Sequence, residues 1–410
     1  MSQAPASAIR LLAGAGARAH IAREGLQAGH VAALAAAAGG PKGLALLGLD
    51  EWLFGTWLAC APRPRLLAGA SIGAWRMAAA MHPDGVKATQ RLGEAYLELQ
   101  RYSARPRPAE VAQVCRAVAA AMLGENTASG ATPWPDHKHE ALGPLAGHRQ
   151  NAPDPSALTR DSQHQLAIIT ARARGPLAGR TDRIGFAHCA WSNLLSRERL
   201  GQHLQRVVFT GSPWSTSAGQ EAPSQRWPNV MEQVRAPAPF EILDDRFETT
   251  PVALTAGNLE DALLASGSIP LVCEPVHTPV GSPQGLYWDG GLIDYHLHLP
   301  WSRLDGLVLV PHFTPYLTPG WLDKSLPWRR RGPSHLRHWL DNVVLIAPSD
   351  ALLARLPNRK LPDRQDFARY GLRHDARIQD WRRAMAECAA MAEDFEAFVR
   401  RPDPACLEAL

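Results

Sequence analysis

Leu66-Leu67-Ala68-Gly69-Ala70-Ser71-Ile72-Gly73-Ala74-Trp75 is an apolar run that two glycines interrupt and that continues as a helix-like segment. The run predicts a buried strand, a sharp turn at Ser71 and a helix, which is the context in which a G-x-S-x-G pattern acts as a nucleophile elbow. Gly69 and Gly73 leave room for the crowded backbone of such a turn. The same five-residue pattern also occurs in turns without chemistry, so it needs support from elsewhere in the chain.

A second glycine-rich turn lies one strand and one helix earlier. Residues 31–38 are apolar and predict a buried strand, which ends in Gly39-Gly40-Pro41-Lys42-Gly43 and is followed by a largely apolar helix over 44–57. Both turns therefore stand at the carboxyl ends of strands, where ligand sites form in parallel α/β sheets. The Gly39–Gly43 turn lacks the G-x-x-x-x-G-K-S/T spacing of a phosphate loop. This difference in spacing excludes nucleotide binding.

The rest of the chain alternates between helical and extended patterns. Helices are predicted over residues 20–29, 74–80, 87–102, 108–123, 258–266 and 375–401, and strands over 166–169, 207–209, 285–288, 307–310 and 343–346. The intervening residues 124–162 predict a long irregular loop. The apolar stripe of the last helix predicts packing on the protein's own core. This alternation predicts an α/β fold with a mostly parallel sheet flanked by helices.

Composition narrows the class of protein. The 410 residues carry 43 Lys and Arg against 39 Asp and Glu, and the resulting charge of +4 is too small to indicate a nucleic-acid partner. Six scattered cysteines without a C-x-x-C pair indicate free thiols in a reducing compartment. The sequence shows neither a secretory signal pattern nor an apolar stretch long enough to span a membrane. We expect a cytoplasmic protein, and a peripheral position at a membrane stays open.

A third motif, Asp289-Gly290-Gly291, follows a predicted strand far downstream, and Ala265-Ser266-Gly267-Ser268-Ile269-Pro270 precedes it. In this order and context, the three motifs resemble the patatin-like phospholipase family of serine–aspartate dyad acyl hydrolases. The resemblance covers roughly residues 31–313. It implies a three-layer acyl hydrolase domain over 20–315. A mainly helical C-terminal extension is expected over 316–410, with one or more strands joining the sheet.

The resemblance also implies roles for individual residues. The nucleophile falls on Ser71, and the catalytic aspartate on Asp289. The oxyanion loop falls on four residues, and an amide beside the nucleophile completes the hole: Gly39, Gly40, Lys42 and Gly43, with Ile72. Family members usually begin this loop with one more glycine, where this chain has Ala38, and Pro41 contributes no N–H. Which amides form the hole therefore stays open, and neither a metal nor an organic cofactor is implied.

The chemistry of such a dyad follows from its groups. A serine hydroxyl is a weak nucleophile that needs a base within hydrogen-bond reach. Because an aspartate with an ordinary pKa of about 3.9 is a poor base, pre-positioning must supply much of the rate. Backbone N–H donors aimed at the oxyanion supply more, about 3–4 kcal/mol each. The implied reaction is hydrolysis of carboxylic esters of a lipid or phospholipid substrate through an acyl-enzyme on Ser71.

Other functions are compatible with the same residues. His296, His298 and His312 follow Asp289 and keep a Ser-Asp-His triad esterase open, because that order is usual for α/β-hydrolases. A catalytically silent lipid-binding protein and an acyltransferase are further alternatives. Two histidine pairs have metal-like spacing but lack a third ligand, so we interpret them as solvated side chains: His137 with His139, and His335 with His338.

The segment between 321 and 339 interleaves tryptophans with arginines, among them Trp321, Trp328, Arg330 and Trp339. This composition is typical of a lipid–water interface, where indole rings lie at the level of the headgroups and cations meet anionic lipid. A surface loop whose tryptophans pack inward is the alternative. As a hypothesis, the segment helps the enzyme to reach aggregated lipid.

Overall fold

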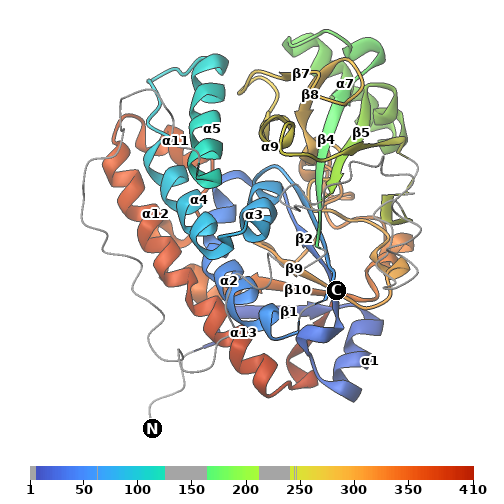
Figure 1. Ribbon diagram of the computed structural model, residues 1–410, viewed down its shortest axis with the longest axis vertical. Helices are drawn as coiled ribbons and strands as arrows, with labels where there is room; N and C mark the ends of the chain where they lie inside the picture. Colours follow the sequence, from blue (N-terminus) through green and yellow to red (C-terminus); the bar gives the residue numbers. More distant parts are fainter. Residues whose placement is uncertain (1–5, 62, 125–163, 212–240, 244, 246) are drawn as a thin grey trace.

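The computed structural model describes residues 6–61, 63–124, 164–211, 241–243, 245 and 247–410. Its centre is an eleven-stranded sheet with nine strands in the order β11-β1-β10-β9-β2-β3-β4-β5-β6, while β8 pairs with β4 and β7 with β8 (Figure 1). The strands are β1 (Ile9–Ala13), β2 (Val31–Ala36), β3 (Leu66–Ala70), β4 (Gln165–Ala173), β5 (Leu204–Gly211), β6 (Thr249–Ala253), β7 (Val276–His277), β8 (Leu286–Asp289), β9 (Leu307–Pro311), β10 (Val343–Pro348) and β11 (Leu407–Ala409).

The pairing of the strands is mostly parallel. The run β10-β9-β2-β3-β4 is parallel throughout, as are the pairs β5–β6 and β1–β11. Antiparallel pairs occur at β1–β10, β4–β5, β4–β8 and β7–β8. A mostly parallel sheet buried on both faces agrees with strands that are apolar along their whole length, such as β2 and β9. The predicted fold class is therefore confirmed.

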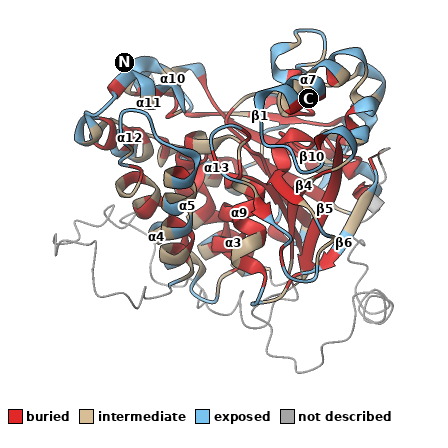
Figure 2. Cartoon of the chain, turned by 90° about the horizontal axis from the view of Figure 1, so that it is seen from above, coloured by how far each residue is buried: buried red, intermediate tan, exposed pale blue. Residues whose placement is uncertain are grey.

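Most of the α-helices cover one face of this sheet. The α-helices are α1 (Ala15–Glu24), α2 (Leu47–Trp52), α3 (Ile72–Met81), α4 (Gly85–Glu98), α5 (Pro108–Leu123), α7 (Arg183–Leu195), α9 (Leu259–Gly267), α10 (Asp350–Arg355), α11 (Gln365–Tyr370), α12 (His374–Cys388) and α13 (Ala390–Arg400). Helix α7 packs instead on the other face, with Ala171 and Ala173 of β4. Every residue of α3 is buried, because α3 packs on β2, β3 and β4 and is flanked by α4 and α9 (Figure 2).

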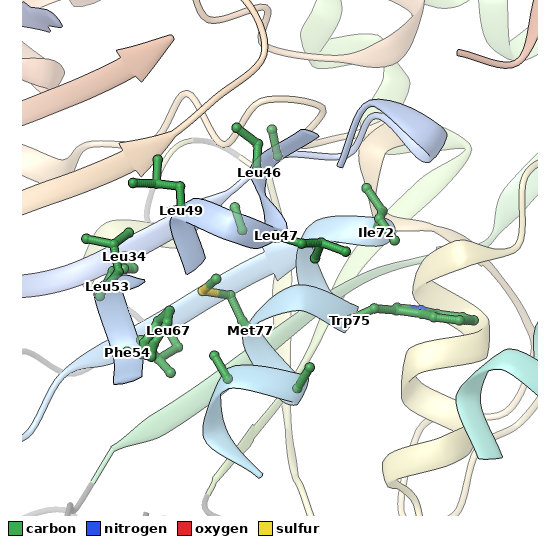
Figure 3. Packing of buried hydrophobic residues seen from close by; sticks show 14 of the residues in the cluster. Leu34, Leu46, Leu47, Leu49, Leu53, Phe54, Leu67, Ile72, Trp75 and Met77 are labelled. Atoms are coloured by element: carbon green, nitrogen blue, oxygen red, sulfur yellow. The ribbon is translucent and has the colours of Figure 1, made fainter. Parts of the chain in front are cut away.

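The main apolar core lies between this helical layer and the sheet. Leu34 of β2 and Leu67 of β3 pack against Leu49 of α2 and Met77 of α3 (Figure 3). Because side chains alternate along a strand, the neighbouring Ala33 belongs instead to a second core on the opposite face. That face is closed by the irregular segments after β8 and β9, which contribute buried residues such as Leu297, Trp301 and Leu340.

Most predicted elements are present, and the exceptions lie at the edges of the fold. The bounds of α5 agree with the predicted helix 108–123. The helix predicted over 375–401 is present as α12 and α13, which only Ala389 separates, and its apolar stripe packs on the protein's own core. The helix predicted over 20–29 is α1, which begins earlier, at Ala15. Strands β1, β6, β7 and β11 were not predicted.

Two further predictions concern the layout of the chain. Strands β10 and β11, from the region after residue 315, are part of the same sheet as β2 and β3. The division of the chain into 20–315 and 316–410 stays a prediction. The loop predicted over 124–162 lies, apart from Gly124, outside the described residues. Within the part of the chain that is described, no helix combines the length and the apolar character needed to cross a bilayer.

Candidate active site

The two predicted catalytic residues come together because two strands share one edge of β4. Strand β3 runs parallel to the first half of β4 and pairs Ala70 with Ile169. Strand β8 approaches from the opposite direction along the second half and pairs Asp289 with Thr170. Ile169 and Thr170 are consecutive, so β3 and β8 end facing each other. The residue after Ala70 is Ser71, which therefore stands beside Asp289.

The backbone at Ser71 has the strained shape expected of an elbow. Its φ of 54° and ψ of −133° lie outside the regions that residues with a Cβ normally adopt. Helix α3 begins immediately afterwards, and a Cβ at Gly73 would lie only 2.0 Å from the carbonyl oxygen of Ala36 in β2. Only glycine permits this close approach of helix and strand. The Ser71 amide donates to Ser266 Oγ at 2.8 Å, which holds the turn from the side of α9.

The segment after α9 also holds Asp289. The Asp289 amide donates to the carbonyl oxygen of Ser268 at 2.9 Å, and the Gly291 amide donates to Asp289 Oδ1 at 2.7 Å. Burial raises the pKa of Asp289 from its ordinary value to about 6, while hydrogen bonds from Ser71 and Gly291 and the charge of Arg364 oppose this rise. Burial thus makes the carboxylate a stronger base, and the Ser71 hydroxyl is its hydrogen-bond partner.

The glycine-rich loop lies on the other side of Ser71. Gly39 precedes the 3-10 helix η2 (Gly40–Leu46), and Gly40 adopts a left-handed φ of 57° that favours glycine. Within the described part of the chain, the amides of Gly39, Gly40 and Ile72 have no hydrogen-bond acceptor, whereas the Ala38 amide donates to the carbonyl of Tyr295 at 2.8 Å. Three free donors close to a nucleophile are what an oxyanion hole requires.

A cavity of about 200 Å³ opens above Ser71 and Asp289. Its wall consists of Ala38, Gly39, Gly40, Lys42, Ser71, Ile269, Pro270, Asp289, Gly291, Leu292, Tyr295, Trp321, Lys324, Asp363, Arg364 and Gln365. Six of the predicted site residues are therefore in the wall. The others lie behind it: Gly43, Ile72, Gly69, Gly73 and Gly290. Gly43, for example, faces the side chain of Ile72, where a Cβ would lie at 2.6 Å.

Several residues of the site were not predicted. Ser266 belongs to the motif over residues 265–270, which predicted no role for its side chain. Trp321, Lys324 and Arg364 come from the C-terminal region, and Arg364 lies directly over the oxyanion loop, with its Cγ 3.6 Å from where a Cβ of Gly40 would stand. The interleaved tryptophans gave a weak signal for Trp321. No local pattern marks Lys324 or Arg364, because only the fold brings them to the cavity.

The three histidines of the triad alternative, His296, His298 and His312, lie away from the cavity. None of the three lines the cavity. His312 is fully buried and accepts from the Thr314 amide at 2.9 Å, and burial lowers its pKa to about 3. His296 accepts from the Thr318 amide at 2.9 Å, and burial and the neighbouring His312 lower its pKa. Burial also lowers the pKa of His298, to about 4. Each ring is thus held as a neutral side chain of the interior.

Buried ion pairs hold the elements that carry the site. Arg76 of α3 forms two hydrogen bonds with the Asp50 carboxylate of α2, at 2.6 and 2.7 Å, and both side chains are buried. This pair connects the helix after the nucleophile with the helix after the oxyanion loop. Arg206 of β5 pairs in the same bidentate way with Asp294, five residues after Asp289, at 2.6 and 2.7 Å. Removal of one partner from such a pair typically costs about 3–5 kcal/mol.

One group of side chains has the composition of a metal site. His20 and Glu24 of α1 and His30 have their ligand atoms within 4.8 Å of one another. The rings of His20 and His30 approach to 2.9 Å between Nε2 and Nδ1, and a hydrogen bond between them accounts for this approach. Of the two pairs discussed from the sequence, His335 and His338 are exposed, and His137 and His139 lie outside the described residues.

Comparison with known proteins places the chain in a family. The family model of patatin-like phospholipase matches residues 34–297, which is more than half of the chain. The chain therefore belongs to the patatin-like phospholipase family, as the order of the three motifs predicted. Lipid acyl hydrolysis is the general activity of this family. The matched range begins within β2 and ends before β9. The strands at one end of the sheet therefore lie outside it, namely β1, β9, β10 and β11. No curated protein matches the chain.

The raised pKa of Asp289 makes a prediction about stability. Because the folded state holds the Asp289 proton up to about pH 6 while the unfolded chain releases it near pH 4, stability falls as pH rises through this window. The ionised carboxylate then costs on the order of 3 kcal/mol at pH 8. Asp289→Asn removes this cost and keeps the acceptor for the Gly291 amide. We expect urea unfolding to show a variant more stable than the wild type at pH 8, with the difference shrinking towards pH 4.

The exposed Asp305→Asn serves as the control for loss of one negative charge. An Asp289→Asn protein that is less stable than the wild type at pH 8 would show that the native fold relies on the charge of Asp289.

Proposed function

We propose that the protein hydrolyses carboxylic esters of lipids through an acyl-enzyme on Ser71, with Asp289 as the base. The observation that carries this proposal is the meeting of a strained serine and a buried aspartate at two facing strand ends, within one cavity. A catalytic base needs a pKa near the working pH, and burial moves that of Asp289 to about 6. Membership of a lipid acyl hydrolase family supports the same reaction.

The reaction follows in two halves. In the first, Asp289 takes the Ser71 proton as Oγ attacks the ester carbonyl, and it then returns a proton to the departing alcohol. In the second, Asp289 takes a proton from water, the hydroxide attacks the acyl-enzyme, and collapse of the intermediate releases the carboxylic acid and restores the serine hydroxyl. Both halves pass through a tetrahedral oxyanion, so one set of donors serves twice.

The amides of Gly39, Gly40 and Ile72 are the proposed oxyanion donors. The first two line the cavity, and Ile72 is the residue after the nucleophile at the start of α3. A helix N-terminus adds a positive partial charge at the same point. Loss of one donor in such a hole typically costs about 3–4 kcal/mol of transition-state stabilisation. The apolar part of the wall, formed by Ile269, Pro270 and Leu292, suits the first carbons of an acyl chain.

The triad esterase is the second candidate, and the burial of the late histidines outside the cavity wall counts against it. A silent lipid-binding protein would need neither the strained backbone at Ser71 nor a buried carboxylate beside it. Acyl transfer differs from hydrolysis only in the acceptor. An added alcohol that yields an ester product would identify it.

Covalent labelling with a serine-directed fluorophosphonate tests the dyad. We expect the wild type to carry one adduct, mapped by mass spectrometry to Ser71. Ser71→Ala should carry none, and Asp289→Asn should react at least a hundredfold more slowly, because the base is lost. Asp363→Asn, which removes a carboxylate from the same cavity wall, is the matched control and should still react. Labelling that survives Asp289→Asn but fails in a His296, His298 or His312 variant would establish the triad instead.

We also propose that the enzyme meets its substrate at an anionic membrane surface. Helix α7 exposes Ile184, Trp191 and Leu195, by 68, 60 and 52% respectively. Trp328 is 68% exposed, and the guanidinium of Arg329 donates to the carbonyls of Asn193 and Leu194 at the end of α7. The exposed tryptophan and this helix thus form one surface, with Arg330 and Arg331 beside it. Trp321 and Lys324 of the same segment line the cavity, so the surface adjoins the site.

The other tryptophans of the segment between residues 321 and 339 pack inward, since Trp321 and Trp339 are half-buried.

Co-sedimentation with vesicles of anionic and of zwitterionic phospholipid tests the proposed membrane surface. We expect Trp191→Ala with Trp328→Ala to weaken binding at least tenfold, and Arg330→Gln with Arg331→Gln to weaken binding to the anionic vesicles alone. Leu372→Ala, at a residue that is 64% exposed elsewhere, is the control. Unchanged sedimentation of the tryptophan variant would exclude this surface.

A further inference from the structure

The hydroxyl group of Ser266 joins the backbone of the nucleophile to strand β4. Ser266 is fully buried in the last turn of α9. Its Oγ accepts from the Ser71 amide at 2.8 Å and donates to the carbonyl oxygen of Ile169 at 2.7 Å. Ala70 and Ile169 form the last pair of β3 with β4, so this hydroxyl continues the connection between the two strands by one residue. A serine hydroxyl can donate and accept at once, whereas an alanine side chain can do neither.

This hydroxyl bridge lies where the backbone is strained. Ser71 leaves the extended conformation of β3 with a φ of 54°, and such a conformation persists only where the surroundings hold it. Ser71, Ser266 and Ile169 are all buried, so water has little access to the amide and the carbonyl that the hydroxyl joins. Without the hydroxyl, both groups lose a partner in the interior, and the backbone at Ser71 loses a restraint.

The same end of α9 also holds the aspartate. Two residues after Ser266, the carbonyl oxygen of Ser268 accepts from the Asp289 amide at 2.9 Å. The Ile169 carbonyl oxygen also lies 2.1 Å from where a Cβ of Gly290 would stand, in the turn after the aspartate. The nucleophile and its base are thus both fixed relative to one helix end and to one carbonyl group of β4.

A separate contact fixes α3, the helix that follows the nucleophile. The indole Nε1 of Trp75 donates to the carbonyl oxygen of Leu263 in α9 at 2.8 Å, and the Trp75 side chain is buried. Helix α3 is therefore tied to α9 independently of the Ser266 hydroxyl. Removal of that hydroxyl is expected to act on the turn at Ser71 and to leave the packing of the two helices in place.

We propose that Ser266 is a positioning residue, whose hydroxyl holds the backbone of Ser71 so that its Oγ stands within attacking distance of a bound ester. The proposal rests on the hydrolase function proposed above. Because Ser266 lies behind the cavity wall, it contacts neither the substrate nor the reacting atoms. Its loss is therefore expected to slow the chemical step and to leave substrate binding unchanged. A displacement of about 1 Å in a reacting group can cost roughly a hundredfold in rate.

The test compares Ser266→Ala with the wild type in two assays, the rate of fluorophosphonate modification and the hydrolysis of a water-soluble p-nitrophenyl ester. We expect the modification rate and kcat to fall about a hundredfold, while KM changes by less than about twofold. The midpoint of the pH profile should stay that of the wild type, because Asp289 keeps its contacts. Ser349→Ala is the matched control and should react as the wild type does. The buried Ser349 hydroxyl also joins an amide to a carbonyl, those of Leu352 and Ser7, at the start of α10.

A second pair of variants separates the effect of the hydroxyl from that of side-chain size. Ser266→Thr and Ser266→Val have the same shape, and only threonine carries a hydroxyl, so we expect the threonine variant to react roughly tenfold faster than the valine variant. Equal rates in this pair, or a wild-type rate in Ser266→Ala, would overturn the proposal. A loss confined to KM, or a shifted pH midpoint, would also overturn it, because the hydroxyl would then act on substrate binding or on Asp289.

Amide hydrogen exchange distinguishes the hydroxyl bridge from the hydrolase itself. The Ser71 amide should exchange faster in Ser266→Ala than in the wild type, whether or not an ester is cleaved. A wild type that is neither labelled nor active would refute the hydrolase, and faster exchange in Ser266→Ala would then still support the bridge. Unchanged exchange at Ser71 would overturn the bridge even where labelling confirms the hydrolase.

Discussion

The site depends on one constraint of the sheet, which is that β3 and β8 end facing each other along the same edge of β4. Two strands that meet in this way place Ala70 and Asp289 opposite consecutive residues of β4. Ser71 directly follows Ala70, so no long side chain is needed to span a gap. The turns that follow have no room for a Cβ at their closest points: at Gly290 one would lie 2.1 Å from the carbonyl oxygen of Ile169. Backbone geometry, more than side-chain reach, therefore sets the distance between the two catalytic candidates.

The same arrangement accounts for the electrostatics. Asp289 is buried with one backbone donor and one hydroxyl as partners, so its charge is costly and its basicity is raised. The charge of Arg364 opposes the rise in the pKa of Asp289 only in part. The buried carboxylates of Asp50 and Asp294, by contrast, each form an ion pair with a buried arginine, Arg76 and Arg206 respectively. A buried carboxylate without such a cationic partner is typical of a site that gives up stability for reactivity.

The sequence predicted the centre of this fold better than its margins. Strand β2 was predicted despite its alanines, because burial on both faces outweighs a poor strand propensity. The short strands β1 and β11, at one end of the sheet, carry no alternation, so only their pairing reveals them. No glycine or proline lies at Ala389, between α12 and α13, so the sequence does not predict this interruption of the helix. Ser71 and Asp289 stood in motifs, whereas Lys324 and Arg364 reach the cavity only through the fold and left no local signal.

The rate at which a fluorophosphonate modifies Ser71, measured against pH, tests the central claim that a buried aspartate is the base. The account predicts that the rate rises with one ionisation near pH 6, reaches a plateau by pH 8, and loses this dependence in Asp289→Asn. A midpoint near pH 7 that survives Asp289→Asn and disappears on substitution of a late histidine would contradict it.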